Sequence, residues 1–239
     1  MKQITGYAVL VLLALSHTGC DEHGVNGSGN LSTETRKLGD FHAVSLRGSM
    51  DVEYTDGPAE DVVIEAEDNV LPLITTEVKD GELIVGQKSN TSIRLHKKIT
   101  VKITAPDVEE LSLAGSGTIR LMNDWEQDDH VKLSVTGSGD VLGAVNSPKV
   151  SVAVTGSGDV KLKGEAKDLN VDIAGSGSFD GYNLHTETTN VHVGGSGDAK
   201  VHASVTLNVQ VSGSGSVDYH GSPTVNSQTS GSGSVHKRD

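Results

Sequence analysis

The chain has little of what usually stabilises a domain of this size. It contains one cysteine, so no disulfide can form within it, and aromatic residues make up only 3% of its 239 residues. Basic residues are also scarce, with 19 Lys and Arg against 32 Asp and Glu and a formal net charge of -13. A chain this acidic lacks the basic surface that polyanions require, which excludes nucleic acid as a partner. Stability must come from a core that needs neither disulfides nor many aromatic rings.

Long apolar runs are also missing, apart from one near the start. Residues 8–15 form an apolar run that follows Lys2 and is too short to span a bilayer. Together with the small residues before Cys20, this run predicts a lipoprotein signal peptide over residues 1–20, with Cys20 lipidated. His17 stands where the lipobox that this segment resembles usually has leucine, so an ordinary secretory signal is the alternative. Residues 21–37 are polar and predict a flexible tether.

What the chain does have is a repeat. From Gly115 to Gly231, the tripeptide Gly-Ser-Gly begins seven times, at intervals of 22, 19, 19, 20, 18 and 18 residues. Apolar residues take every second position on either side of it, as at Val152, Val154 and Val160 around Gly156, which is typical of strands with one buried face. The motif's glycines predict structural turns at Gly115, Gly117, Gly137, Gly139, Gly156, Gly158, Gly175, Gly177, Gly195, Gly197, Gly213 and Gly215.

A near-constant period of this size indicates stacked coils. Each period holds two short strands joined by a glycine corner, and equivalent strands pair in parallel about 4.8 Å apart. Because parallel crossovers are right-handed, we predict an all-β fold, a right-handed parallel β-solenoid with about 18–22 residues per coil. We expect one domain over 38–239, with irregular coils over 38–110 and regular repeats over 111–239. Ser227 and Thr229 replace apolar residues in the last coil, which we interpret as a polar cap against end-to-end stacking.

The order of several segments resembles a known family. FHAVSLRGSMDVEYT, VLPLITTEVKDGELIV, ITVKITAPDVEELSLAGSG and the GSGDV units follow one another as in the bacterial head GIN domain family, over about residues 38–235. The family is described as auto-transporter adhesins. The resemblance implies an exported, often lipid-anchored protein with a β-solenoid-like fold, and it implies no chemistry and no catalytic residues. Residues 46–50, Leu-Arg-Gly-Ser-Met, depart from the Gly-Ser-Gly-type turn that the family favours there.

The longest interval contains the strongest candidate contact site. Its extra residues include the only tryptophan, and the candidates are Asp124, Trp125, Glu126, Asp128 and Asp129. A protruding acidic loop with one aromatic ring can stack a sugar or bind a cation. The alternative is a loop whose tryptophan covers the edge of the core.

Two further patterns carry weaker alternatives. Asp140, Asp159 and Asp198 follow the glycine corner and resemble part of a calcium-binding repeat, but the opposite turns lack matching aspartates. His202 and His220 are equivalent in adjacent coils and could together bind a transition metal, but no third ligand shares their column. We therefore expect corner hydrogen bonds and exposed histidines, with no metal and no cofactor.

The pattern predicts a protein that is not an enzyme, because no triad or close carboxylate pair stands out. We expect a cell-envelope lipoprotein attached to the membrane by its lipid, binding an envelope polysaccharide or a protein partner. The alternatives are a structural spacer or self-associating assembly component, and a carbohydrate-active enzyme on the same kind of scaffold.

Overall fold

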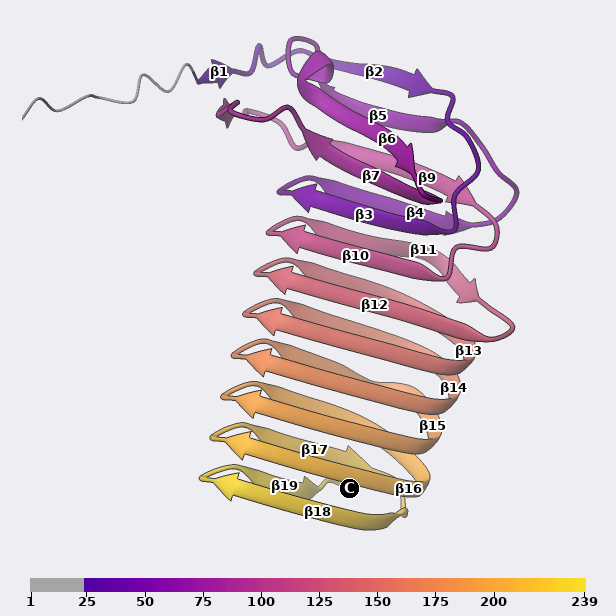
Figure 1. The fold of residues 1–239 in the computed structure, drawn as a ribbon, viewed down its shortest axis with the longest axis vertical. Coiled ribbons are helices and arrows are strands. Elements are labelled where there is room, and N and C mark those ends of the chain that lie inside the picture. Colours follow the sequence, from indigo (N-terminus) through magenta and orange to yellow (C-terminus); the bar gives the residue numbers. More distant parts are fainter. Residues whose placement is uncertain (1–23) are drawn as a thin grey trace, which may run out of the picture.

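The structure is a computed structural model, and it describes residues 24–239. The predicted signal peptide and Cys20 lie outside the described residues. The molecule is elongated, with a regular stack of coils below an irregular N-terminal cap (Figure 1). Apart from one 3-10 turn, η1 (Leu71–Leu73), every regular element is a strand, as predicted for an all-β fold. No helix in the described part of the chain has the length and apolar character to cross a bilayer.

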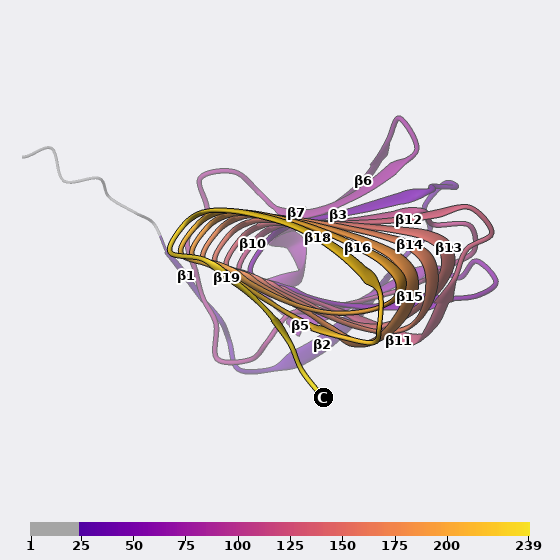
Figure 2. The same cartoon turned by 90° about the horizontal axis from the view of Figure 1, so that it is seen from below.

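The regular stack is a parallel β-solenoid, as the repeat predicts. Each coil runs along one flat face, turns at the glycine corner, returns along a second face, and turns again into the next coil (Figure 2). Its strands are β10 (Glu110–Gly115), β11 (Thr118–Glu126), β12 (His130–Gly137), β13 (Asp140–Gly156), β14 (Asp159–Gly175), β15 (Ser178–Gly195), β16 (Asp198–Gly213), β17 (Ser216–His220), β18 (Thr224–Gly231) and β19 (Ser234–Lys237). The long strands β13 to β16 continue around the second corner, which joins the two faces.

The register of the stack follows the repeat. Equivalent glycines pair in parallel between successive coils, at Gly48, Gly115, Gly137, Gly156, Gly175, Gly195, Gly213 and Gly231. Inside the stack, apolar side chains form columns, one of which consists of Leu113, Val135, Val154, Ile173, Val193 and Val211. Each of these six is at most 1% exposed. Full burial of such a side chain stabilises the fold by roughly 1.5–3 kcal/mol, so a core of many valines replaces the missing aromatic rings.

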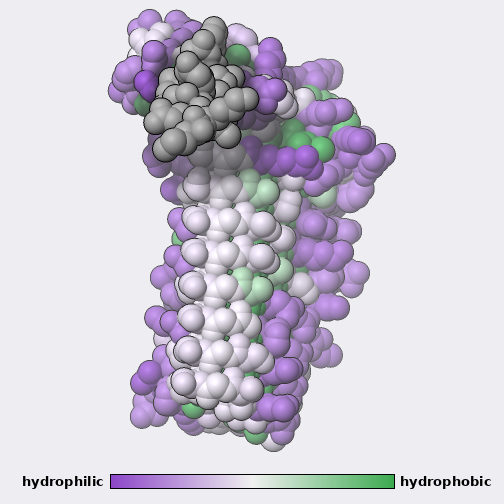
Figure 3. Space-filling view, turned by 60° about the vertical axis from the view of Figure 1, so that its left-hand side comes forward, coloured by the Kyte–Doolittle hydropathy of each residue, from purple (hydrophilic) through white to green (hydrophobic). Residues whose placement is uncertain are grey.

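The glycine corner requires glycine for two physical reasons. At Gly137 the backbone has φ +117°, and a Cβ there would lie 2.4 Å from the Gly115 carbonyl oxygen in the coil above. At Gly139 a Cβ would lie 2.6 Å from the Leu113 side chain. All twelve predicted turn glycines lie along this corner. On the surface they form a continuous pale ridge of glycine and serine (Figure 3).

Strands before the regular stack build the first coil and the cap. They are β1 (Val25–Asn26), β2 (Leu31–Arg36), β3 (Ala43–Gly48), β4 (Asp51–Asp56), β5 (Val62–Glu67), β6 (Ile74–Lys79), β7 (Glu82–Gln87), β8 (Ile93–Arg94) and β9 (Thr100–Ala105). Strands β3 and β4 pair in parallel with β10 and β11, so they form an early coil around the Gly48 corner. Above them the pattern changes, because β2 with β5, β5 with β9, and β6 with β7 are antiparallel.

The predicted tether over residues 21–37 is wrong for most of its length. Strand β2 pairs along β5 from Leu31 to Arg36, and the Arg36 guanidinium donates hydrogen bonds to the carbonyl oxygens of Leu71 and Ile74. Most of β2 is exposed, so it shows no alternation of apolar and polar residues. Its stability comes from backbone pairing rather than from a buried face, which is why the sequence pattern does not reveal it.

A buried carboxylate holds the segment that precedes β2. The Glu67 side chain is 0% exposed, and it accepts hydrogen bonds from the backbone N–H groups of Gly29, at 2.7 Å, and His96, at 3.2 Å. The His96 imidazole Nδ1 lies 3.5 Å from the same carboxylate. A Cβ on Gly27 would overlap Glu67, so the chain passes directly over this side chain. The first described residues are therefore part of the folded cap.

Candidate functional site

The predicted contact loop lies where β11 meets β12, and the structure corrects its central residue. Trp125 is 0% exposed, and its indole Nε1 donates a hydrogen bond to the Val108 carbonyl oxygen at 2.8 Å. Its ring meets Tyr54 edge to face, with centroids 5.8 Å apart. The expectation that Trp125 stacks a ligand is therefore wrong, because its ring already packs in the core. Trp125 pairs with Val145 in the next coil, which places it in a buried column.

The acidic residues of the same loop do face solvent. Asp124, Glu126, Asp128 and Asp129 are all exposed. Two backbone contacts fix the loop, because Glu126 N–H donates to the Asp56 carboxylate at 3.0 Å and Gln127 N–H donates to the Asn146 carbonyl oxygen at 3.1 Å. These hydrogen bonds hold the loop in place as an exposed acidic segment, which we call the acidic rim. Ligand contact by its four acidic residues stays a prediction.

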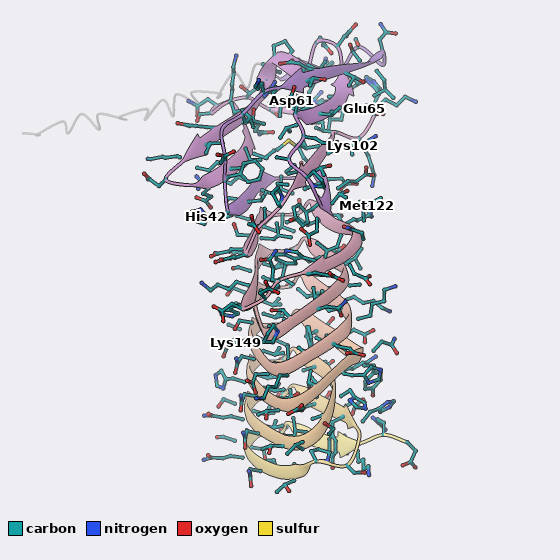
Figure 4. All side chains as sticks on the ribbon, turned by 90° about the vertical axis from the view of Figure 1, so that its right-hand side faces the viewer. His42, Asp61, Glu65, Lys102, Met122 and Lys149 are labelled. Carbon is teal, nitrogen blue, oxygen red and sulfur yellow. The ribbon has the colours of Figure 1, made fainter. Side chains whose placement is uncertain are left out.

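This rim borders a groove along the second corner, which we call the corner groove. It has a volume of about 580 Å³, and its lining includes Asp128, Asn146, Glu165, Lys167, His185 and His202. Figure 4 looks onto this corner, with Met122 and Lys149 on its two flanks. The groove runs along the stack and so crosses several coils.

A column of polar side chains follows the corner groove. Strand pairing places Glu126, Asn146, Glu165, His185, His202 and His220 on successive rungs. Neighbouring rungs of a parallel sheet lie about 4.8 Å apart, so this column offers hydrogen-bonding groups at a regular interval. The half near the cap carries carboxylates and the half near the C-terminus carries imidazoles.

The histidines of this column number three, not the two that spacing suggests. His202 pairs with His220, as predicted, but His185 pairs with His202 on its other side, with ring centroids 4.6 Å apart. Tyr182, which counting from the glycine corner places in this column, instead stacks on His220 at 4.2 Å. The reason is that the register shifts at Asp180 to His185, which counting along the sequence does not show.

Burial and neighbouring positive charge both act on the middle histidine. The pKa of His202 is lowered from its usual value, first by burial and then by repulsion from His185 and His220. Lowering the pKa favours the neutral imidazole, which can both donate and accept a hydrogen bond. Within residues 24–239, no group of three or more His, Cys, Asp or Glu side chains has a geometry suited to a metal ion. Of the three histidines, His185 and His202 line the corner groove.

Two of the three aspartates after the glycine corner, Asp159 and Asp198, accept hydrogen bonds from the next coil. Ser178 Oγ donates to Asp159 at 2.6 Å, and Ser216 donates to Asp198 through both its N–H, at 2.9 Å, and its Oγ, at 2.6 Å. Asp140 and Asp159 are on adjacent rungs. These contacts match the expected role of Asp and Ser at a solvent-facing corner.

Comparison with known proteins places the chain in a family. A family model described as "Putative auto-transporter adhesin, head GIN domain" matches residues 40–223. A comparison with curated proteins found no match. Among solved structures, one of a putative adhesin from Bacteroides fragilis is 28% identical, with a TM-score of 0.85, and the match covers 90% of this chain and 100% of that one.

Two more distant structures share the fold. One, from Parabacteroides distasonis, is described as a putative lipid binding protein and is 23% identical, with a TM-score of 0.77 over 90% of this chain and 100% of that one. The other, a putative adhesin from Parabacteroides merdae, is 22% identical, with a TM-score of 0.72 over 90% of this chain and 99% of that one. The fold is a stacked solenoid with a glycine corner, and the family model matches most of the described residues. The chain therefore belongs to the head GIN domain family of adhesin-like proteins.

Proposed function

We propose that this protein is a non-catalytic binding protein of the bacterial cell envelope, with an adhesin-like role, that holds an extended neutral polysaccharide in the corner groove. The observation that carries the proposal is the part of the column from Asn146 to His202, which repeats a polar side chain on each coil along an open groove. The family description and the neighbour from Bacteroides fragilis support the adhesin-like role.

The repeat of the column suits a ligand that is itself a repeat. A single exposed hydrogen bond contributes only about 0.5–1.5 kcal/mol net, so one rung binds weakly. A rigid row of rungs adds such contacts along a polymer without new ordering of the protein, and the affinity rises with ligand length. The net charge of -13 disfavours polyanionic polymers, which makes a neutral polysaccharide the better fit.

We further propose that a lipid on Cys20 holds the N-terminal cap close to the membrane. Four residues, 21–24, separate Cys20 from β1, and an extended chain of that length reaches only about 14 Å. The cap and the C-terminal coil lie at opposite ends of the stack (Figure 1). The groove, which runs along the stack, then extends away from the bilayer. Metabolic labelling with a palmitate analogue tests this anchor, since label that persists in Cys20→Ala would contradict it.

A structural role as spacer or assembly component is the second candidate. The in-register pairing of successive coils makes a straight, rigid rod, which supports this role as well. The two candidates differ in one respect, because only the binding role requires the side chains of the groove.

A matched pair of double variants tests the binding role. Glu165→Ala with His185→Ala removes two adjacent exposed side chains of the groove column, and Asp172→Ala with His192→Ala removes an exposed acid–histidine pair from the outer face of the same two strands. We expect the groove variant to bind neutral envelope polysaccharides at least roughly five-fold more weakly, and the outer-face variant to bind like the parent. Equal binding by all three proteins would contradict the groove as the site.

A further inference from the structure

In the described part of the chain, the last coil of the stack has an outer edge with no partner strand. Within residues 24–239, β18 pairs only with β16, and β19 pairs only with β17. Seven of the eight residues of β18 are exposed, and the two strands lie at the end of the stack, facing the viewer in Figure 2. A row of unpaired backbone N–H and C=O groups at a sheet edge is a template for another strand.

The edge strands of the cap carry charges that β18 lacks. Strand β2 contains Glu34 and Arg36, and β6 contains Glu77 and Lys79. Charged side chains on an edge strand are a common protection against pairing with another chain. The sequence of β18 is TVNSQTSG, with no charge and no proline. The predicted polar cap is present, but its basic residues, His236, Lys237 and Arg238, lie on β19 and after it, so β18 itself carries no charge.

A side-chain ladder also ends with a free acceptor at this edge. On one face, asparagines on successive coils donate in one direction, from Asn190 to Asn170 at 3.0 Å, from Asn208 to Asn190 at 2.8 Å, and from Asn226 to Asn208 at 3.0 Å. Each amide nitrogen donates to the carbonyl oxygen of the coil before it. The Asn226 carbonyl oxygen therefore stands at the open end with no following donor within the described chain.

We propose that this end is a self-association surface, at which a second copy of the chain pairs its own β18 antiparallel to the first and forms a tail-to-tail dimer. A two-fold axis perpendicular to the two faces reverses the strand direction and brings β18 against β18 and β19 against β19. A copy of the chain satisfies both open edges at once, whereas a single extended peptide covers only one. Because β18 is uncharged, self-pairing opposes no like charges along it.

The two ends of the stack differ, because the cap covers the N-terminal end and the C-terminal end has open strand edges, and the assembly therefore stops at two copies. A two-fold interface uses the same surface on both subunits, so the open end is consumed in the dimer. The other end is covered by the antiparallel strands β2, β5 and β6 with their charges, which blocks head-to-tail growth into a fibre. After β19, Arg238 turns back to pair with Asp218 at 3.1 Å, so its charge is neutralised within its own chain.

Sedimentation equilibrium over micromolar to millimolar protein tests the proposal, on the chain from residue 21 onward, which keeps every described residue. Gln228→Lys places a charge near the middle of exposed β18, where antiparallel pairing brings the two copies of this residue close together. Ala153→Lys makes the same kind of change in the same outward column, four coils away. We expect a monomer–dimer equilibrium that Gln228→Lys weakens at least ten-fold and Ala153→Lys leaves unchanged.

Spin labels provide a second readout that does not depend on a disruptive variant. The chain from residue 21 contains no cysteine, so Gln228→Cys can be labelled at one site. Tail-to-tail pairing predicts a short interspin distance for this label and no resolvable short distance for a label at Glu77→Cys on the cap. A protein that stays monomeric at millimolar concentration would overturn the proposal. Open-ended filaments, or equal weakening by both lysine variants, would also overturn it.

Discussion

Gly195→Ala adds one methyl group at the glycine corner, in the middle of the stack. Gly195 has φ +124°, where a residue with a side chain is strained by about 1–3 kcal/mol. The new Cβ would lie 2.4 Å from the Gly175 carbonyl oxygen, and real Cβ atoms essentially never approach closer than 3.0 Å. That oxygen belongs to a backbone paired in register, so moving it strains the neighbouring coil by about another 1–3 kcal/mol.

The expected loss for Gly195→Ala is therefore about 4 kcal/mol in the free energy of unfolding. For a domain of about 200 residues, each kcal/mol lowers the melting temperature by about 2–4 °C, so the variant should melt about 8–16 °C below the parent. Differential scanning calorimetry and chemical denaturation both measure this change.

The preceding residue provides a matched control. A Cβ on Gly194 would meet nothing closer than the Ile173 carbonyl oxygen at 3.7 Å, and Gly194 has no left-handed φ. Gly194→Ala should be as stable as the parent or gain up to about 1 kcal/mol from the less flexible unfolded chain. If Gly195→Ala and Gly194→Ala change the melting temperature equally, close approach of the coils is not why the corner requires glycine.

Two further predictions concern side chains at the loop and the second corner. Trp125→Phe should lose about 1–3 kcal/mol because the Val108 carbonyl oxygen loses its donor, and Trp125→Ala should lose about 3–5 kcal/mol, both measured by denaturation midpoints. Unchanged stability of Trp125→Ala would contradict the buried placement of the ring. Because the pKa of His202 is lowered in the fold, the unfolded chain binds more protons as pH falls, so stability is present above the usual histidine pKa of about 6.5 and decreases below it. Melting temperatures between pH 8 and pH 5 should fall less for His202→Gln than for the parent, and identical pH slopes would argue against this effect.

The sequence predicts the regular stack well because two signals agree there. Gly-Ser-Gly marks one corner of each coil, and β-branched residues such as Val152 and Val154 alternate on the strand before it. The need for glycine at the corner and the burial of an apolar face both leave a pattern within a few residues of sequence. The register between coils then follows from counting residues from one Gly-Ser-Gly to the next. The alternation around Gly48 also predicts an early, degenerate coil, and Gly48 pairs with Gly115 as the other corners do.

Elsewhere the sequence misleads for identifiable reasons. Strand β2 is an exposed strand that is held by backbone pairing, so it has no apolar pattern to detect. Trp125 sits among acidic residues, yet its rung is buried against Tyr54 while its neighbours face solvent. His185 joins the groove column only because the register shifts between Asp180 and His185. Contacts between distant segments decide each of these three cases.

Binding measured against ligand length tests the central claim most directly. Calorimetric titration of the chain from residue 21 with neutral envelope polysaccharide fragments of increasing length should show an affinity that rises until the fragment spans the corner groove and then levels off. The double variant Glu165→Ala with His185→Ala should flatten this rise. Affinity that does not change with length, or no binding to any fragment, would contradict the account of the groove as a polymer-binding site.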